Sequence, residues 1–327
     1  MKNVEKKLRQ EFDSIHEETK SFREGDVYQF VIASVKGISQ IVLIENVITG
    51  LIILAAITVA SPFLGIVTLL SVVIGTFVAL IGGADKNAVH SGLFGYNSAL
   101  SGLALALFLT GPYSWIIALI GAAIASILTA ALMHFIKETT IPILTFPFVI
   151  ITWFMLLLSY KLEVFQLSST LTPGTLSNWT LNITGDIDWL SGFILGIAQI
   201  FFLENIISGI LLFIALFWAG WKFGLYAIIA SAMALLTAFL LGAEHDLISL
   251  GLYGYNAILS IIAISIIFKE TENRFALISG ISGAVLTILI TASLSIWLVP
   301  FGLPALTMAF VLSSWIFLGA RKVMPNF

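Results

Sequence analysis

QIVLIENVITG at residues 40–50 returns as QIFFLENIISG at residues 199–209, with six of eleven residues identical at an offset of 159. The same offset relates GADKNAVHSGLFGYNSALS at 83–101 to GAEHDLISLGLYGYNAILS at 242–260, where nine of nineteen residues are identical. Similarity that recurs at a fixed offset is typical of a duplicated structural unit. The two pairs of segments therefore predict a chain built from two copies of one ancestral half.

A third pair of segments extends the duplication toward the end of each half. PILTFPFVIITW at 142–153 matches PALTMAFVLSSW at 304–315 at six of twelve positions, with the offset increased to 162. Chance similarity among Leu, Ile, Val and Gly does not explain polar residues that recur in register, because such residues are costly to bury among apolar ones. The repeated polar pairs are Gln40 and Gln199, Glu45 and Glu204, Asn97 and Asn256, and Thr145 and Thr307.

The composition places the chain in a membrane. Of its 327 residues, 59% are hydrophobic and 10% are charged, whereas about a quarter of the residues of a soluble protein are charged. Residues 1–26 alone hold six of the fifteen basic and seven of the eighteen acidic side chains. The net charge of −3 argues against a nucleic-acid partner, and the absence of cysteine excludes disulfides and thiolate metal sites.

Apolar runs follow the same order in both halves. They fall near 28–60, 62–83, 97–109, 112–136 and 141–160, and again near 189–219, 224–242, 256–268, 274–298 and 302–320. The stretches 86–96 and 245–255 are too short to cross a bilayer at about 1.5 Å per residue, so we expect re-entrant half-helices there. The predicted fold is an all-α polytopic membrane protein of two repeats, each with five transmembrane helices and one half-helix, with about ten spans in total.

The basic residues predict that the second repeat is inverted relative to the first. Five spans per half reverse the direction of the chain, and an inside N-terminus then leaves thirteen Lys and Arg inside, Lys161 outside and Lys36 within the first span. The predicted organisation, with both termini in the cytoplasm, is a tail at 1–26, a first repeat at 27–160, an extracellular linker at 161–188, a second repeat at 189–320 and an end at 321–327.

Inverted repeats bring equivalent residues together near the middle of the membrane. We expect a pathway there, lined by amide and hydroxyl oxygens and by the apolar or aromatic residues near them. These candidates are Gln40, Gln199, Thr145, Thr307, Leu43, Phe202, Tyr96, Tyr255, Leu100 and Leu259. Because oxygen acceptors without charge favour a neutral solute with many N–H donors over an ion, the pathway suits a small amide.

The repeated carboxylates have two interpretations. In one, Glu45 and Glu204 form a proton relay or a cation site within the membrane. In the other, they brace a bend, since each precedes an Asn and a Gly follows that Asn by four residues. We favour the second interpretation and assign a structural role near the pathway to Glu45, Glu204, Asn97 and Asn256.

Missing patterns exclude several other classes. No two of the four histidines occupy equivalent positions, which argues against an ammonia channel with paired pore histidines. The sequence has no Asn-Pro-Ala motif, no phosphate-binding loop and no catalytic constellation, which argues against an aquaporin, an ATP-driven pump and an enzyme. We therefore expect neither a cofactor nor a bound metal.

The doubled motifs [IL]-E-N-x-[IL]-[TS]-G, G-x-[FY]-G-Y-N and P-x-L-T-x-x-F-V resemble those of the urea transporter family of bacteria and vertebrates. The likeness covers residues 30–320. It implies a homotrimer in which each protomer has its own pore, with an oxygen ladder at Gln40, Gln199, Thr145 and Thr307. The slot walls it implies are Leu43, Phe202, Tyr96, Tyr255, Leu100 and Leu259. Leu43 and the two tyrosines depart from the Phe-rich slots of the family, which leaves open the preference among urea, methylated ureas and ammonia.

The resulting functional prediction is passive, channel-type transport of urea down its gradient across the plasma membrane. Urea is planar and neutral, so a narrow slot selects its shape while oxygen acceptors replace the water that it loses. The alternative is a proton- or sodium-coupled transporter of a small polar solute that uses Glu45 and Glu204. The expected partners are urea and close analogues, the lipid bilayer and two further copies of the chain.

Overall fold

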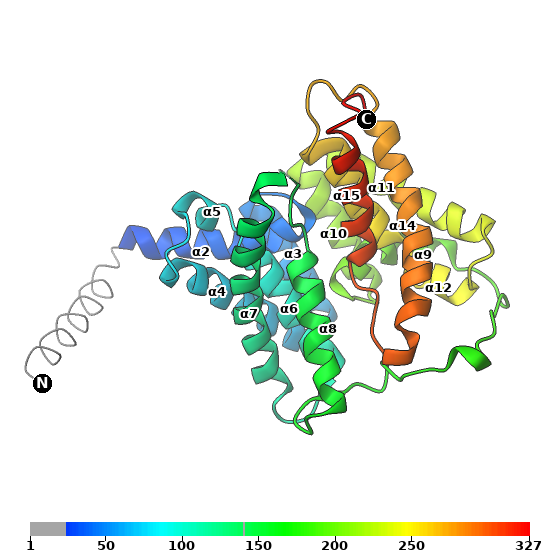
Figure 1. Cartoon of the computed structure of the whole chain (residues 1–327), viewed down its shortest axis with the longest axis horizontal. Coiled ribbons are helices and arrows are strands. Elements are labelled where there is room, and N and C mark those ends of the chain that lie inside the picture. The colour runs from blue at the N-terminus through cyan, green and yellow to red at the C-terminus, as the bar shows by residue number, and fades with distance from the viewer. Residues whose placement is uncertain (1–23, 140) are drawn as a thin grey trace, which may run out of the picture.

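The computed structural model describes residues 24–139 and 141–327, and the chain forms fourteen α-helices within these ranges. Most of the predicted tail, residues 1–23, lies outside the described residues. The helices of the first half (blue to green in Figure 1) are α2 (Glu24–Ser39), α3 (Val47–Ala60), α4 (Pro62–Ile81), α5 (Lys86–His90), α6 (Gly95–Phe108), α7 (Ser114–Phe135) and α8 (Phe146–Leu157).

The second half repeats this order. Its helices are α9 (Trp189–Ala198), α10 (Ile206–Ala219), α11 (Trp221–Leu240), α12 (His245–Ser249), α13 (Gly254–Ile262), α14 (Ala276–Leu298) and α15 (Met308–Ala320). Short 3₁₀ turns, η1 (Gln40–Val42) and η5 (Gln199–Phe201), extend α2 and α9, and a π-helical turn, η6 (Ala263–Ile267), extends α13. The remaining 3₁₀ turns are η2 (Lys137–Thr139), η3 (Leu158–Tyr160), η4 (Leu176–Asn178) and η7 (Val299–Phe301). The duplication of the sequence is therefore a duplication of the fold.

Four helices are long and apolar enough to cross a bilayer alone, namely α4, α7, α11 and α14. The runs expected as single spans at 28–60 and 189–219 are each broken into two helices, which meet at 74° in the first half and 75° in the second. If each bent pair counts as one span, the described residues hold up to six spans by length and composition. The remaining helices are shorter, so the total of about ten crossings stays a prediction.

The two stretches expected as half-helices contain little helix. Residues 86–96 form the five-residue α5 and a turn that ends where α6 begins at Gly95, and residues 245–255 form α12 and the same turn before α13. Both turns contain a glycine with positive φ, Gly92 at 83° and Gly251 at 72°. The glycine interrupts the helix, and the chain then continues into α6 and α13, which are almost entirely buried.

Reciprocal hydrogen bonds relate the two halves by a pseudo-two-fold rotation. The indole N–H of Trp153 on α8 donates to the carbonyl of Pro304 at 2.8 Å, and the indole N–H of the equivalent Trp315 on α15 donates to the carbonyl of Pro142 at 2.8 Å. A contact that recurs with its partners exchanged is the signature of a two-fold interface. The two tryptophans therefore bond α8 to the segment that precedes α15, and α15 to the segment that precedes α8.

A second reciprocal pair joins α3 to α10. The Thr49 hydroxyl donates to the carbonyl of Ala215 at 3.4 Å, and the equivalent Ser208 hydroxyl donates to the carbonyl of Ala56 at 2.7 Å. All these residues are buried, so each hydroxyl satisfies its donor inside the apolar interior. The interface between the halves therefore runs from α8 and α15 to α3 and α10.

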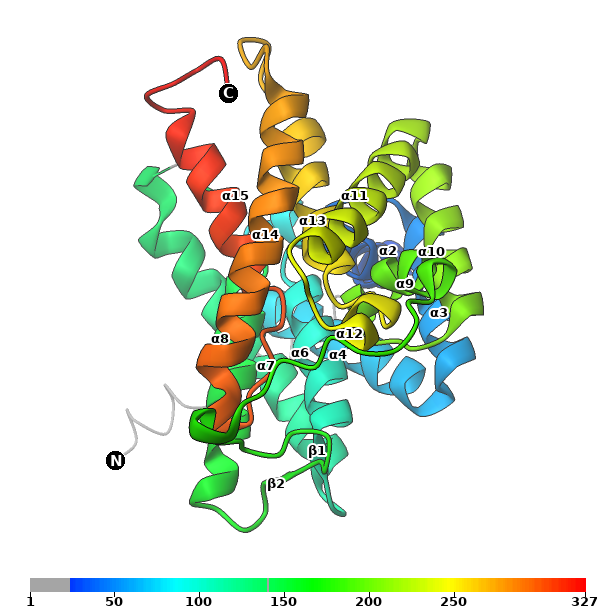
Figure 2. The same cartoon turned by 90° about the vertical axis from the view of Figure 1, so that its right-hand side faces the viewer.

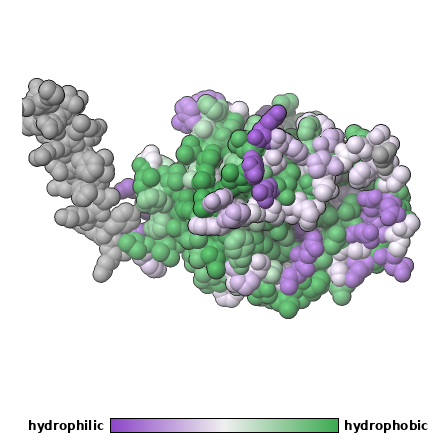
Figure 3. Space-filling view, turned by 90° about the horizontal axis from the view of Figure 1, so that it is seen from below, coloured by the Kyte–Doolittle hydropathy of each residue, from purple (hydrophilic) through white to green (hydrophobic). Residues whose placement is uncertain are grey.

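The outer surface is apolar where the helices face away from the interior. Figure 3 shows hydrophobic residues over much of one face, and exposed side chains include Ile66 and Phe77 on α4, Phe154 on α8 and Trp218 on α10. Contiguous apolar surface of this kind requires lipid or another protein surface around it. The exterior thus agrees with a multi-pass membrane protein.

Polar loops gather at opposite ends of the molecule. The strand β1 (Leu109–Thr110), which follows α6, pairs antiparallel with β2 (Gln166–Leu167), which follows α8. This pair lies at the bottom of Figure 2, whereas the C-terminal residues lie at the top. Within the linker, the backbone N–H of Asn182 donates to the Glu244 carboxylate at 3.0 Å, next to α12. The linker therefore lies over the end of the molecule that carries α12.

Gly92 provides a test of the close approach between α2 and the turn before α6. A Cβ at Gly92 would lie 2.5 Å from the backbone nitrogen of Gly37, whereas Gly83, also at positive φ, has nothing within 4 Å of that position. Gly83→Ala should lower the free energy of unfolding by about 1–2 kcal/mol, because alanine is strained in this backbone conformation. Gly92→Ala should lower it by about 1–3 kcal/mol more, because its methyl group overpacks the contact. We expect a clearly larger drop in the melting temperature in detergent for Gly92→Ala. Equal drops would show that α2 and the turn can move apart at this point without loss of stability.

Candidate functional site

Each break between α2 and α3, and between α9 and α10, turns on a large apolar residue with left-handed backbone. Leu43 has φ 63° and the equivalent Phe202 has φ 57°. Such a conformation costs a non-glycine residue about 1–2 kcal/mol, so its presence twice at equivalent positions suggests a need for the side chain. The next helix then starts at an asparagine cap, where the side chains of Asn46 and Asn205 each accept a backbone N–H at 2.9 Å.

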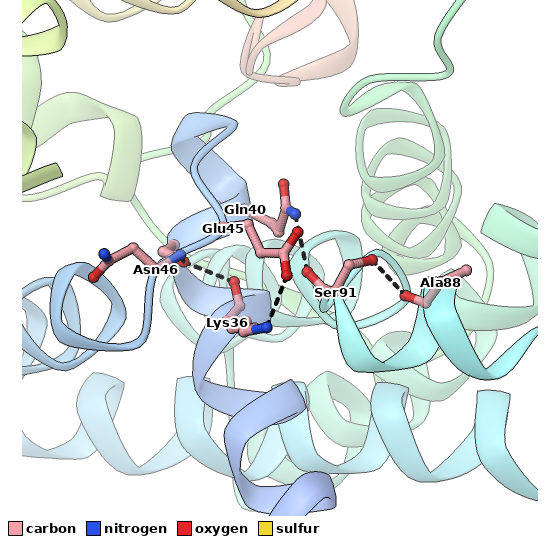
Figure 4. Close-up of polar contacts among 7 residues, drawn as sticks. Lys36, Gln40, Glu45, Asn46, Ala88 and Ser91 are labelled. Atoms are coloured by element: carbon pink, nitrogen blue, oxygen red, sulfur yellow. Dashed lines mark hydrogen bonds and ion pairs between the residues drawn. The ribbon is translucent and has the colours of Figure 1, made fainter. Parts of the chain in front are cut away.

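The amides of Gln40 and Gln199 have defined orientations. Gln40 Nε2 donates to the carbonyl of Ser91 at 2.9 Å, and Gln199 Nε2 donates to the carbonyl of the equivalent Leu250 at 3.0 Å. A carbonyl only accepts, so the amide group that faces it must be the NH₂. Each Oε1 therefore remains as an acceptor on the opposite side of the amide, as Figure 4 shows for Gln40.

The two carboxylates differ in their surroundings. Glu45 forms an ion pair with Lys36, 2.7 Å from Nζ to Oε1, across the break between α2 and α3 (Figure 4). At the position equivalent to Lys36 the second half has Leu195, and the exposed Glu204 forms no ion pair with any described residue. Because the two breaks have nearly the same angle, the ion pair is not what sets the bend.

Asn97 on α6 supports the broken backbone ahead of α8. Its Oδ1 accepts the backbone N–H of Phe148 at 3.3 Å, and its Nδ2 donates to Thr129 Oγ1 at 3.2 Å and to the carbonyl of Leu144 at 3.4 Å. The Tyr96 hydroxyl donates to the same Leu144 carbonyl at 2.6 Å. Leu144 itself has φ 52°, so these bonds hold another left-handed residue in place.

The second half repeats every part of this arrangement. Asn256 Oδ1 accepts the backbone N–H of Phe310 at 3.1 Å, and the Tyr255 hydroxyl donates at 2.8 Å to the carbonyl of Leu306, whose φ is 51°. Asn256 Nδ2 also donates to the Thr291 hydroxyl at 3.2 Å. The tyrosines and asparagines therefore connect α6 and α13 to the starts of α8 and α15.

The residues at those two helix starts, Thr145 and Thr307, meet at the centre of the protein. Their hydroxyl oxygens are 2.6 Å apart, and each residue is 1% exposed. Neither hydroxyl caps its own helix, because Asn97 and Asn256 accept backbone N–H groups in the first turns instead. Equivalent residues that touch each other lie on the pseudo-two-fold axis, so the N-termini of α8 and α15 face one another there.

A cavity of about 450 Å³ is bordered by Leu144, the residue before Thr145. It is lined by thirteen residues, twelve of which are uncharged: Gln40, Leu43, Leu93, Tyr96, Met133, Ile136, Ile141, Pro142, Ile143, Leu144, Ile267 and Phe268, with Lys137 as the charged one. A separate, more open depression is bordered by Glu45, Asn87, Ala88, His90, Ser91 and Leu93. The described residues contain no group of three side chains suited to hold a metal ion.

The candidate residues thus fall into four sets. Gln40, Leu43 and Tyr96 line the cavity, and Thr145 and Thr307 meet at the axis. Gln199, Phe202 and Tyr255 occupy the equivalent places in the second half, where the Phe202 ring packs against Phe108 at 5.4 Å and Phe148 at 6.4 Å between centroids. Leu100 and Leu259 are completely buried and do not border the cavity.

Sequence reasoning missed several residues of this region. The carbonyls of Ser91 and Leu250 orient the two glutamines, and Ile267 and Phe268 form part of the cavity wall. The repeat itself offered no signal for Phe268, because no aromatic residue stands at its offset of 159, where the sequence has Leu109. Backbone carbonyls give no signal in a sequence at all.

The asparagine caps and the ion pair at the breaks can be compared by mutation. Because both halves have the cap but only the first has the pair, we expect Asn46→Ala and Asn205→Ala each to lower stability by about 1 kcal/mol. Glu45→Gln should cost less than about 1 kcal/mol, since its side chain is half exposed. Chemical unfolding in detergent measures all three variants. A Glu45→Gln loss larger than both Asn losses would contradict the interpretation of the break as cap-determined.

Comparison with known proteins agrees with this arrangement. The family model described as urea transporter matches residues 31–322. The protein named urea transporter 1 of Ovis aries is 29% identical over 303 residues, which cover 91% of this chain and 79% of the relative, and its counterpart in Mus musculus is 28% identical over 305 residues, covering 92% and 79%. A doubled set of seven helices, a threonine pair at the two-fold axis, and a family match across almost the entire chain lead to one conclusion: the protein belongs to the urea transporter family, whose members are non-enzymatic membrane transporters.

Proposed function

We propose that the protein is a passive urea channel in which the solute passes from the Gln40 cavity, past the threonine pair at the axis, to the equivalent region around Gln199. The observation that carries this proposal is the fixed orientation of the two glutamine amides, each with its NH₂ tied to a backbone carbonyl. Each Oε1 is then an acceptor that does not need to reorient when urea arrives. Such preorganisation reduces the cost of binding a donor-rich solute.

The lining favours a neutral solute over an ion. In the cavity, apolar side chains such as Leu43 and Leu93 surround Gln40, and the charged Lys137 is the exception. A cation would lose its hydration shell without a carboxylate to replace it, a cost of many kcal/mol. Urea loses fewer hydrogen bonds, and each replacement contributes only about 1 kcal/mol, enough to offset dehydration without trapping the solute.

The coupled-transporter alternative receives less support. Glu45 is paired with Lys36 and borders the open depression, whereas the Gln40 cavity has no carboxylate in its lining. Glu204 is exposed and has no basic residue at the position equivalent to Lys36. A carboxylate that binds a coupling ion would need to face the solute pathway, and neither residue lies in the described lining.

The remaining organisation is part of the same proposal. The distribution of Lys and Arg supports an extracellular linker at 161–188 and cytoplasmic ends, which puts the Gln40 cavity on the cytoplasmic side. The wide apolar exterior supports a membrane protein. A location in the plasma membrane and assembly as a homotrimer, with one pathway in each protomer, are what the resemblance to the family implies. The deciding measurement for assembly is the mass of the protein in detergent or nanodiscs.

The proposal predicts urea flux that depends on the urea gradient alone. Purified protein in liposomes should accelerate urea equilibration, measured by stopped-flow light scattering, and the rate should be the same with and without an imposed pH or Na⁺ gradient. Net uphill accumulation of radiolabelled urea driven by either gradient would instead establish the coupled transporter. Protein-free liposomes supply the background rate.

The oriented glutamines supply a residue-level prediction. Gln40→Ala and Gln199→Ala should each lower urea flux by roughly tenfold, because each removes an acceptor worth about 1 kcal/mol together with its fixed geometry. Gln166→Ala, on an exposed strand of the linker, is the matched control and should conduct like the parent. If both pathway variants assemble normally and also conduct like the parent, the glutamines are structural and the solute passes elsewhere.

A further inference from the structure

We propose that Phe268 is the aromatic wall that sets the size limit of the Gln40 cavity, and that Arg321 is the positioning residue that holds it there. The inference rests on the proposed urea pathway and adds a determinant of its specificity. Phe268 lines the cavity together with Leu43, the residue that replaces an aromatic one in the first half. Its position depends on a local change in helix geometry.

The π-helical turn η6 shifts the register of the second half by one residue. In the first half α6 ends regularly, with the N–H of Leu109 bonded to the carbonyl of Leu105, four residues earlier. In the second half the N–H of Phe268 bonds to the carbonyl of Ala263, five residues earlier, at 2.9 Å. A π turn accommodates one extra residue. The offset between the halves therefore grows from 159 to 160, which aligns Phe268 with Phe108 instead of Leu109.

The aligned phenylalanine has a known neighbour in the first half. Phe108 packs edge-on against Phe202, with ring centroids 5.4 Å apart. The pseudo-two-fold relation exchanges Phe202 with Leu43, so the counterpart of that contact lies between Leu43 and Phe268, which line the same cavity. Without the π turn, the residue in this place would be Ile267. The π turn thus places an aromatic side chain, Phe268, beside Leu43, which is not aromatic, whereas its equivalent Phe202 is.

Arg321 fastens the π turn from the end of α15. Its guanidinium donates to three backbone carbonyls: Nη2 to Ile264 at 2.6 Å, Nη1 to Phe268 at 2.8 Å and Nε to Phe327 at 2.8 Å. Carbonyls at the end of a helix lack partners in the helix itself and carry partial negative charge, so a buried arginine stabilises them. Arg321 is 9% exposed, and two of its three hydrogen bonds go to the backbone at the π turn.

A second contact locks the same turn to the neighbouring helix. The Ser265 hydroxyl, inside η6, donates to the carbonyl of Ala276 at the start of α14 at 2.9 Å. The turn is therefore held from α14 on one side and from α15 on the other. The first half has neither contact, because Ala106 stands at the offset of Ser265 and α6 runs on into β1. The fixed wall is a feature of one mouth of the pathway.

The test is the ratio of urea to 1,3-dimethylurea permeability in proteoliposomes. Phe268→Ala should lower this ratio by roughly tenfold, because a wall contact of this size discriminates substrates by that order. Arg321→Gln should also lower the ratio, by a smaller factor. The ratio of Arg321→Lys should lie between those of Arg321→Gln and the parent. Lys322→Gln, which removes the same charge from an exposed neighbour, should keep the parent ratio.

Hydrogen exchange tests the hydrogen bonds from Arg321 to the π turn without depending on flux. In Arg321→Gln the amide of Phe268 should exchange faster than in the parent, while amides in α4 should be unchanged. If Phe268→Ala assembles normally and keeps the parent permeability ratio, Phe268 does not set the size limit. If the exchange of the Phe268 amide is unchanged in Arg321→Gln, Arg321 does not position Phe268. The parent protein's own urea flux in the same vesicles tests the proposed function separately, because these ratios and exchange rates compare variants only with the parent.

Discussion

The centre of the protein depends on the hydrogen bonds that the side-chain amides of Asn97 and Asn256 form with the backbone. Each accepts a backbone N–H in the first turn of a short helix, α8 or α15, and donates to the carbonyl of the left-handed leucine before it. In an apolar interior such broken backbone is tolerated only where protein or water satisfies it. Because the asparagines do so, the hydroxyls of Thr145 and Thr307 are released from capping and meet on the axis.

Around this centre the chain keeps strained backbone at four large apolar residues. Leu43, Phe202, Leu144 and Leu306 all have positive φ, and they form two equivalent pairs. Glycine would adopt these conformations without the steric cost. Each of the four lies one to three residues from a glutamine or threonine of the proposed pathway, so an apolar side chain and a polar oxygen lie close together in the chain. The strained residues thus lie next to the residues of the proposed pathway, and backbone outliers are expected to gather at functional sites.

Divergence between the halves is concentrated at the mouth near Gln40. There Lys36 pairs with Glu45, whereas the equivalent position in the second half is Leu195, and Leu43 stands where the second half has Phe202. The π turn and Arg321 are likewise confined to one side. The two-fold frame is built from reciprocal contacts that need both halves, such as those of Trp153 and Trp315, and these have stayed the same. Differences near Gln40 leave that frame intact, so the two ends of the proposed pathway can differ in size and charge.

The sequence alone determined the membrane class, the duplication and the paired polar residues, because composition and periodic identity are properties of the chain itself. Only the tertiary structure decided how the polar pairs are used. It broke the expected span at 28–60 into two helices at 74°, reduced the expected half-helix at 86–96 to five residues, and turned Tyr96 and Asn97 into braces for Leu144. Those outcomes depend on backbone carbonyls, left-handed leucines and a one-residue π insertion. Residue type signals none of them, because each arises from packing between segments that are far apart in the chain.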